Sequence, residues 1–286
     1  MTSTTLSSQT LAPEIMIQLA HMPDMLIQHL QNIRACVNDV LAPKEHTDTK
    51  KTSTHHWLIL HGSAVHAENW HETSSDLNLM LVVQDASPER IVALYQHLRP
   101  LKRTWPMTLE ILTQPELLRS TDVFPLKYLD IQRHHVMLHG PEDALMNLSI
   151  SWDHLRLRLE QQLRSLLFHL RQQLPHIHHR PEELYTFIDL HLSTLWSCLG
   201  TLMFLHQSDW WIASRKIIIT QCSDYFATID ATLLHTLLAM RQRTHTIHSA
   251  AHLTHTADNL YKLLVELSAI ADTLDADSSS SNQEEE

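Results

Sequence analysis

The chain has 286 residues, of which 43% are hydrophobic and 19% are charged, and its formal net charge at pH 7 is −11. A chain of this length can hold two domains that each bury a core, and its composition is typical of a soluble globular protein. The acidic balance argues against unspecific binding to nucleic acid or to anionic membranes.

The cysteines Cys36, Cys198 and Cys222 lie far apart and show no C-x-x-C spacing. They are therefore expected to be free thiols in a reducing compartment. The N-terminus has no lysine or arginine before Arg34, unlike a secretory signal. The longest apolar run, residues 187–205, includes an aspartate and several hydroxyl side chains, which predicts a buried helix rather than a membrane span. We expect a cytoplasmic protein that does not bind membranes.

Residues 1–23 are expected to be disordered or loosely ordered, because their first half is rich in serine and threonine. A helix is predicted for residues 24–41, where apolar side chains recur at helical spacing. Pro43 and the polar stretch after it end this helix.

Two apolar runs of strand length follow, at Trp57–His61 and Leu77–Val83. Between them lie the Gly62-Ser63 turn and a polar loop that contains Trp70. The whole chain has only three glycines. Gly62, directly after a strand, therefore indicates a backbone with positive φ or one that a bound group approaches closely.

Beyond the second strand, Ser87-Pro88 begins a helix that is predicted to end before Pro100. Residues 108–113 alternate between polar and apolar side chains and predict a third strand. The remaining elements are a short helix and two extended segments, at residues 115–119, 128–131 and 136–138. The alternation of strands and helices predicts an α/β (α+β) domain with a mixed sheet over residues 24–145.

From residue 151 onward the chain has one glycine and almost no strand signal. Leucines recur at helical spacing up to Pro175, which is expected to stop this first helix. A long, mostly apolar helix is predicted to begin at Pro181, and three more helices are predicted at about residues 212–226, 231–242 and 250–274. Residues 151–275 are thus predicted to form an all-α helical bundle domain, followed by a disordered acidic tail at 276–286.

The Gly62-Ser63 turn and the start of the second strand are candidates for a phosphate and metal site. Asp76 and Asn78 are two residues apart along a strand, so their side chains project from the same face. A turn that offers backbone N–H groups can hold a phosphate, and nearby carboxylates can hold Mg²⁺. Glu110, in the third predicted strand, is the candidate for a further carboxylate. Each residue also has a structural interpretation, as a turn, cap or strand-start residue.

In this order, Gly62-Ser63 followed by Ser75-Asp76-Leu77-Asn78 resembles the Gly-Ser…Asp-x-Asp/Glu signature of the nucleotidyltransferase fold, the polymerase-beta-like superfamily. Over residues 24–275 the chain is similar to bacterial members of two domains, a nucleotidyltransferase-like domain and a C-terminal helical one. The segments at residues 122–140 and 153–164 are similar to the linking segment and to the start of the helical part of those proteins.

The resemblance implies that a nucleoside monophosphate passes from a Mg²⁺-bound NTP, held between the two domains, to an acceptor that the sequence does not identify. In that interpretation Gly62 and Ser63 contact the phosphates. Asp76, Asn78 and Glu110 are the catalytic and metal-binding residues.

The chain departs from the family pattern at Asn78, where an active enzyme carries a second carboxylate. An asparagine oxygen can bind a metal ion, but it is neutral, and one missing charge beside divalent ions is a large electrostatic deficit. Two functions stay open. One is nucleotidyl transfer with a weakened metal site, and the other is a catalytically inactive module that binds a nucleotide or a protein partner.

The second half of the chain contains two weaker patterns. Arg243 and His248 have the Arg-x4-His spacing of the helical HEPN ribonucleases, and His245, His248, His252 and His255 would form a stripe on a helix that could bind zinc or nickel. In a chain with 24 histidines, such alignments also arise from composition alone.

Two single residues have open interpretations. Trp70 could stack on a nucleotide base or could anchor its own loop. Asp189, in an otherwise apolar helix, could face a cleft between domains or could be hydrogen-bonded within the bundle.

Overall fold

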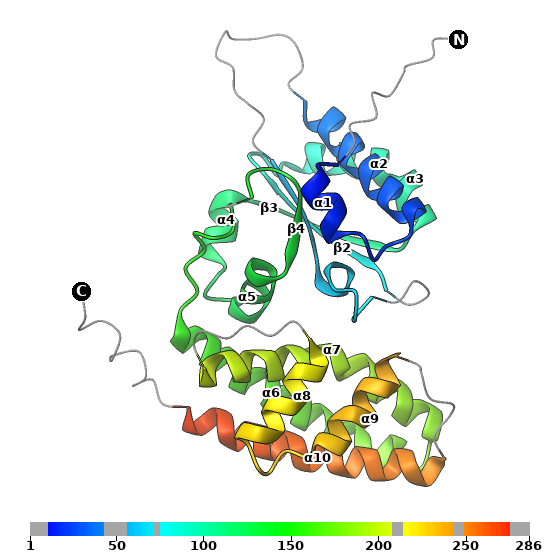
Figure 1. The fold of residues 1–286 in the computed structure, drawn as a ribbon, viewed down its shortest axis with the longest axis vertical. Coiled ribbons are helices and arrows are strands. Elements are labelled where there is room, and N and C mark those ends of the chain that lie inside the picture. The colour runs from blue at the N-terminus through cyan, green and yellow to red at the C-terminus, as the bar shows by residue number, and fades with distance from the viewer. Residues whose placement is uncertain are drawn as a thin grey trace, which may run out of the picture. The chain divides into compact units, whose positions relative to one another are not determined.

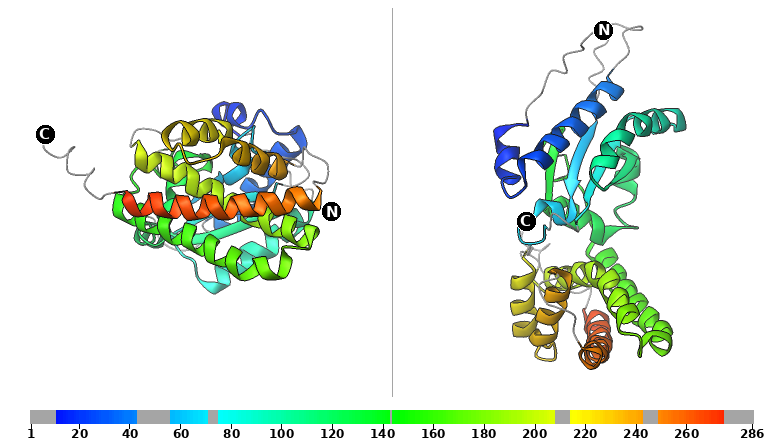
Figure 2. Two further views of the ribbon diagram at one scale, coloured as in Figure 1. Left: turned by 90° about the horizontal axis from the view of Figure 1, so that it is seen from below. Right: turned by 90° about the vertical axis from the view of Figure 1, so that its right-hand side faces the viewer.

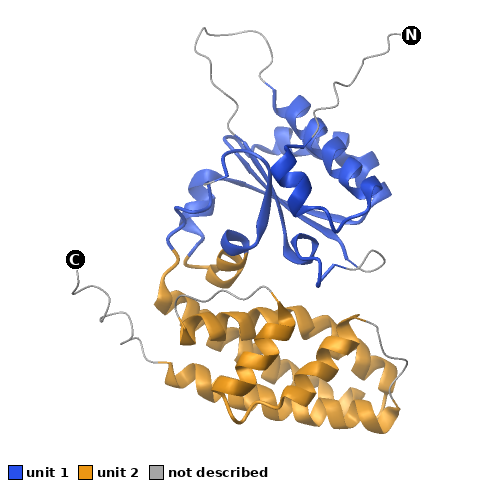
Figure 3. Cartoon of the chain, in the orientation of Figure 1, with its two compact units in different colours: residues 1–121, 131–149 blue, residues 122–130, 150–286 orange. Residues whose placement is uncertain are grey.

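The computed structural model describes residues 11–42, 56–70, 75–142, 144–207, 214–242 and 249–274. Over these ranges the fold is mixed α/β, with ten α-helices, one short 3-10 helix and four strands (Figure 1). The chain divides into two compact units (Figure 3). The first unit comprises residues 1–121 and 131–149, and the second unit comprises residues 122–130 and 150–286.

The first unit is built on one mixed sheet of four strands. They are β1 (Trp57–His61), β2 (Leu77–Val83), β3 (Met107–Thr113) and β4 (His135–His139), in the order β3-β2-β1-β4. β1 pairs antiparallel with β2 and β4, whereas β2 and β3 are parallel. The sequence predicts all four strands, and the bounds of β1 and β2 are confirmed.

One face of this sheet packs on the helices α1 (Pro13–Gln18), α2 (Asp24–Leu41) and α3 (Pro88–Thr104) (Figure 1). The sheet side chains in this core alternate along each strand, as expected for a sheet with a buried face: Leu58, Leu60, Leu77, Leu79, Leu81, Met107, Leu109, Val136 and Leu138. The residues between them, including Asn78 and Glu110, project from the other face. The candidate site therefore lies opposite the main core of the first unit.

The N-terminal prediction is wrong for residues 11–23. This stretch contains α1, and Leu11, Leu19 and Met22 are at most 5% exposed within the core of the first unit. Apolar side chains follow the Ser/Thr-rich stretch closely, and their burial against α2 and the sheet orders the backbone. Residues 1–10 lie outside the described residues.

Two further predictions fail because packing overrides a local signal. α3 continues through Pro100 to Thr104, where Leu98 and Leu101 still pack on the core, at the cost of the hydrogen bond that proline cannot donate. Residues 128–131, predicted as extended, belong to the helix α5 (Pro125–Arg133). Four apolar residues do not distinguish a strand from a buried helix, and Pro125 suits the first turn of a helix.

The second unit is a bundle of five helices, α6 (Trp152–Ile177), α7 (Pro181–His206), α8 (Arg215–Tyr225), α9 (Ala231–Gln242) and α10 (Ala250–Thr273). α6, α7 and α10 pack along one another (Figure 2). The predicted leucine stripe of α6 is buried from Leu155 to Leu170, although the helix passes Pro175 and ends at Ile177. Leu126 and Leu129 of α5 join this core, which is why their segment belongs to the second unit.

Helix α7 explains the longest apolar run of the sequence. By length and composition it is the one helix in the described part of the chain that could cross a membrane. Of its most apolar window, 61% is buried inside the protein, including Leu199 and Leu202. A buried core helix passes the same test, and α7 contacts each of the other four helices of the bundle. The three cysteines are free, as predicted.

The short helix α4 (Gln114–Arg119) follows β3, and its own local sequence fixes where it begins. Thr113, the last residue of β3, is its N-cap, and its Oγ1 accepts a hydrogen bond from the backbone N–H of Glu116. In return, the Glu116 carboxylate accepts hydrogen bonds from the backbone N–H and the hydroxyl of Thr113. Because these hydrogen bonds stabilise the carboxylate, they hold the pKa of Glu116 below its usual range. The cap fixes where β3 ends, and α4 then packs back on β2 and β3.

Candidate functional site

The turn after β1 and the start of β2 meet at the end of the sheet. His61, the last residue of β1, pairs with Asn78 in β2. Gly62 follows with φ +76° and opens a 3-10 helix that runs from Gly62 to Val65. A Cβ atom on Gly62 would lie 3.2 Å from Nδ2 of Asn78. Gly62 therefore suits this position for two reasons. It adopts a positive φ without strain, and it has no Cβ atom that would press on Asn78.

Asp76 and Asn78 are joined to each other. Nδ2 of Asn78 donates a hydrogen bond to Oδ1 of Asp76 at 3.4 Å. Asp76 is exposed just before β2, whereas Asn78 and Ser63 are half-buried. The structure thus brings Gly62, Ser63, Asp76 and Asn78 to one place, as their order in the sequence predicts.

Glu110 does not belong to this group. In the parallel pairing of β2 and β3, Asn78 lies opposite Thr108, and Glu110 lies opposite Met80. Glu110 therefore projects from the same face as Asn78 but two residues further along the sheet. Met80 comes four residues after Asp76, so at about 3.3 Å per residue Glu110 lies about 13 Å from Asp76 along the strand direction. The residue of β3 that lies opposite Asn78 is the neutral Thr108.

These residues do not fit a pair of magnesium ions. Two-metal transfer uses ions about 4 Å apart that share carboxylate ligands. Of the predicted ligands at the turn, Asp76 is a carboxylate and Asn78 is neutral, and the residue opposite Asn78 in β3 is the neutral Thr108. Within the described ranges, no three His, Cys, Asp or Glu side chains are grouped so that they could hold a metal ion. The oxygen donors at the turn lack the charge that hard divalent cations require.

Histidines surround the turn, a feature that sequence reasoning missed. His61 pairs with Asn78 on one side and with His135 of β4 on the other. The rings of His66 and His134 meet edge to face, with centroids 4.3 Å apart. Burial lowers the pKa of His135, and the neighbouring His134 adds to this effect. The strand ends bring together histidines that lie up to 74 positions apart in the chain.

Trp70 and Asp189 have partners of their own. Trp70 is 9% exposed, and its ring stacks on Trp105 with centroids 6.0 Å apart. This contact favours the loop-anchor interpretation over base stacking. Oδ1 of Asp189 lies 3.5 Å from Nη1 of Arg241 within the bundle.

The two histidine patterns of the second unit fall partly outside the described residues. Arg243, His245 and His248 lie there, so the ribonuclease spacing and the metal stripe stay predictions without geometry. Of the remaining members, His255 is described in α10, where its Nε2 lies 3.0 Å from Nδ2 of Asn259.

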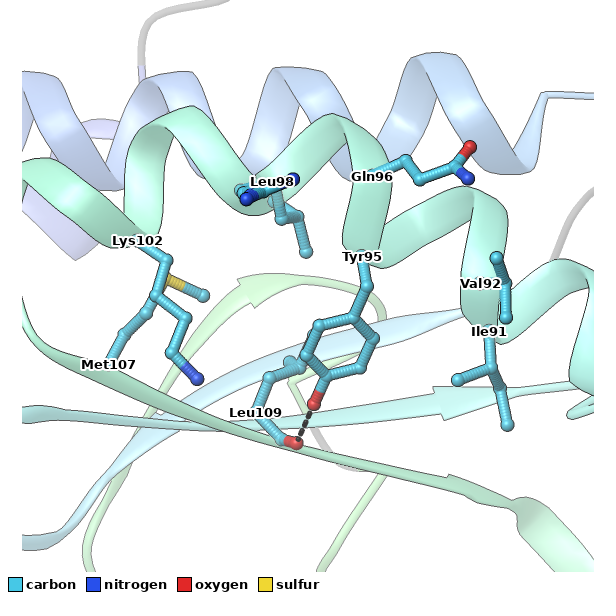
Figure 4. A pocket seen from close by; sticks show the side chains of 9 residues that line it. Ile91, Val92, Tyr95, Gln96, Leu98, Lys102, Met107 and Leu109 are labelled. Carbon is cyan, nitrogen blue, oxygen red and sulfur yellow. Dashed lines mark hydrogen bonds between the residues drawn. The ribbon is translucent and has the colours of Figure 1, made fainter.

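A separate groove of about 360 Å³ lies between α3 and β3 (Figure 4). Its lining is mostly apolar, with a basic rim: Ile91, Val92, Tyr95, Gln96, Leu98, Arg99, Lys102, Met107 and Leu109. Met107 and Leu109 alternate along β3 with Thr108 and Glu110. Because neighbouring residues of a strand point to opposite faces, the groove does not include the predicted site residues.

Comparison of the chain with models of known protein families and with curated protein sequences gives no match.

Proposed function

We propose that the first unit is a nucleotidyltransferase-like module that does not carry out two-metal nucleotidyl transfer and instead acts by binding. The order of its elements and the Gly62-Ser63…Asp76-x-Asn78 pattern support the nucleotidyltransferase likeness. The pairing of β2 with β3 carries the rest of the proposal, because it leaves Thr108 beside Asn78 and puts Glu110 opposite Met80.

Electrostatics explains why this arrangement stops the chemistry. Two unit charges 4 Å apart interact by about 4 kcal/mol at the effective dielectric constant of a protein surface. Each missing carboxylate therefore removes a contribution of this size for every unit of metal charge it would face. With Asp76 alone, the two ions that polarise the phosphates and activate the acceptor are not held together.

The turn itself keeps the features of a phosphate-binding loop. Gly62 has a positive φ and a short 3-10 helix follows it, an arrangement typical of turns whose backbone N–H groups hold an anion. The ligand we propose for this turn is the phosphate chain of a nucleotide, held with little or no help from a metal ion. The surrounding histidines can add positive charge when they are protonated.

Rebuilding the acidic triad tests this proposal. We expect the wild-type protein to turn over no α-labelled NTP in the presence of Mg²⁺. Asn78→Asp combined with Thr108→Asp places three carboxylates on neighbouring positions of β2 and β3, and should tighten Mg²⁺-NTP binding by at least about tenfold. Titration calorimetry with Mg²⁺-NTP measures the affinity, and product analysis of the labelled nucleotide measures turnover.

Two further variants act as controls for this experiment. In the rebuilt protein, Asp76→Ala should abolish the gain, whereas Glu110→Gln should leave it, because Glu110 lies two residues away from Thr108 along β3. Turnover by the wild-type protein that is lost in Asp76→Ala would overturn the proposal and establish an enzyme. A protein in which neither form binds NTP would rule out nucleotide binding at the turn.

The groove between α3 and β3 supports a second candidate function, the binding of a protein partner. Val92 is 55% exposed and Tyr95 38% exposed in an apolar groove that Arg99 and Lys102 flank. Exposed apolar side chains beside a charged rim are typical of interaction sites. The basic rim matches a partner segment that carries both apolar and acidic side chains.

A partner in the groove would contact side chains rather than pair with the backbone of β3. β3 is an edge strand, and its odd-numbered residues direct their backbone groups away from β2. The hydroxyl of Tyr95 donates a hydrogen bond to the outward carbonyl of Leu109 at 3.0 Å (Figure 4). This bond protects the edge against strand addition, so a partner would dock through its apolar face.

Photo-crosslinking tests the groove. A benzoylphenylalanine in place of Val92 should form an adduct of defined mass in cells, and the same substitution at Ile17, 76% exposed on α1, should not. Reversing the charge of the rim with Arg99→Glu and Lys102→Glu should remove the adduct. An adduct that forms equally from position 17, or that survives the charge reversal, would contradict specific docking in the groove.

A further inference from the structure

The second unit holds a half-buried arginine, Arg215, for which no ion pair is found within the described part of the chain. Arg215 begins α8, and its Cζ lies 5.9 Å from the centre of the Trp196 ring in α7. Burial, followed by the charge of Arg241, lowers the pKa of Arg215 to about 10, and Asp130 opposes this shift. No ion pair of Arg215 is found among the described residues.

A buried donor lies in the same place. Trp196 is 4% exposed, and its Nε1 has no hydrogen-bond partner within the described part of the chain. A buried indole N–H normally finds an acceptor, and leaving it without one costs about 1–3 kcal/mol. Within the described part of the chain, Arg215 thus has no ion pair and the indole N–H of Trp196 has no acceptor.

The second arginine is only partly neutralised. Nη1 of Arg241, in α9, lies 3.5 Å from Oδ1 of Asp189. A guanidinium has five N–H donors, so one contact of this length leaves most of them available. Asp130 and Asp189 act as counter-charges of the two arginines, so the cluster is balanced in formal charge.

The start of α8 adds to this surplus of donors. The first N–H groups of a helix have no partner inside the helix and carry a partial positive charge. Acidic side chains are common at this position, yet the first turn of α8 has none and contains Arg215 and Lys216 instead. The side chain of Ser214 makes no capping hydrogen bond to the helix. This charge pattern disfavours the helix end unless an anion lies there.

We propose that Arg215, Arg241, the N-terminal N–H groups of α8 and Nε1 of Trp196 form a binding site for an oxyanion of the phosphate type. Guanidinium groups bind such anions through two parallel hydrogen bonds. The oxyanion supplies the acceptors that Arg215 and Trp196 lack, and it separates the two arginine charges. The site belongs to the second unit alone and does not depend on the function proposed for the first.

Phosphate binding to the full chain tests this site. The midpoint of thermal unfolding and titration calorimetry are measured with inorganic phosphate and, in a second arm, with adenosine monophosphate, at constant ionic strength. The wild-type protein should show saturable binding and a rising midpoint, because a ligand that binds only the folded state stabilises it. Tighter binding of the nucleotide would identify a phosphate monoester, and equal binding would identify a site for the free ion.

Arg215→Gln should weaken phosphate binding at least about tenfold, the loss expected for a hydrogen bond to a charged group. Trp196→Phe should weaken it less, because it removes a neutral donor and keeps both charges. Arg171→Gln is the matched control. Arg171 also lies over an aromatic ring of the second unit, that of Tyr261 at 5.4 Å, but it donates hydrogen bonds to the Tyr261 hydroxyl. This variant should bind phosphate like the wild type.

A purely structural role for Arg215 predicts a different result. In that case Arg215→Gln lowers the unfolding midpoint with and without phosphate, and phosphate affinity stays unchanged. This outcome would overturn the proposal, as would the absence of saturable phosphate binding by the wild-type protein. If Arg215→Gln does not fold, Arg241→Gln decides between the two roles, because unchanged affinity in that variant also contradicts the site.

Discussion

Replacing Gly140 by alanine is expected to lower the free energy of unfolding by about 3 kcal/mol, from backbone strain and overpacking together. Gly140 follows β4 with φ +121°, in a region that L-residues rarely adopt. A Cβ atom there would lie 2.9 Å from Cδ1 and 3.3 Å from Cα of Trp57, the first residue of β1. Because a backbone atom is part of the clash, a side-chain rotation cannot relieve it.

The other two glycines provide a graded control. At Gly62, a Cβ atom would meet only the movable amide of Asn78, so Gly62→Ala should cost about 1–2 kcal/mol, the price of a left-handed backbone. At Gly200, inside α7, the nearest atom is Cδ1 of Ile218 at 3.7 Å, an ordinary contact. Gly200→Ala should therefore stabilise the protein by about 0.5–1 kcal/mol.

Urea unfolding followed by circular dichroism gives the three values. The expected order is a large loss for Gly140→Ala, a smaller loss for Gly62→Ala and a gain for Gly200→Ala. A Gly140→Ala variant as stable as the wild type would show that β1 and β4 can shift past each other at low cost. The pairing of these strands is already irregular between Leu58 and Ile59, so this result is a meaningful alternative.

The strands could be predicted because each signal is local. Trp57–His61 and Leu77–Val83 are short apolar runs bounded by polar and glycine residues, and they have the predicted bounds. The pairing between strands is not a local property. The sequence placed Glu110 in the correct strand, but its position opposite Met80 rather than Asn78 depends on the register of β3 against β2. This difference of two residues decides whether Glu110 lies beside Asp76 and Asn78.

Proline and composition misled the prediction where tertiary packing competes with them. α3 and α6 pass through Pro100 and Pro175 because apolar residues beyond each proline, Leu101 and Ile177, still pack on a core. The burial of a large apolar side chain contributes about 1.5–3 kcal/mol, which is comparable to the cost of a proline within a helix. A single sequence does not show which of the two contributions is larger.

The arginine cluster of the second unit has no sequence signature at all. Trp196, Arg215 and Arg241 come from three helices, and Asp130 comes from α5. Of its members, only Asp189 stood out in the sequence, as an acid in an apolar helix. The sequence left open whether Asp189 faces a cleft or has a partner within the bundle, and the fold places Arg241 beside it.

Acidification from pH 7.5 to pH 5 is expected to destabilise the first unit. Burial lowers the pKa of His29, His135 and His139, and the charge of Arg34 adds to the effect at His139. An unfolded histidine has a pKa of about 6.5. Below that pH the unfolded chain binds more protons than the folded one, so the free energy of unfolding falls as the pH falls, until each folded pKa is reached. Each histidine contributes at most about 1.4 kcal/mol per pH unit.

Amide hydrogen exchange at several pH values, corrected for the intrinsic exchange rate, measures this loss separately in the two units. Protection of β1 and β4 should decrease below pH 6.5, because His135 and His139 both belong to β4 and all three histidines lie in the first unit. His29→Leu provides the internal check. His29 is 6% exposed in α2, and its Nε2 has no partner within the described residues. Removing it should therefore lower the dependence of the free energy of unfolding on pH by the equivalent of up to one proton. It should also raise the free energy of unfolding at pH 5. A slope that His29→Leu leaves unchanged would mean that this ring keeps its ordinary affinity for protons despite its burial.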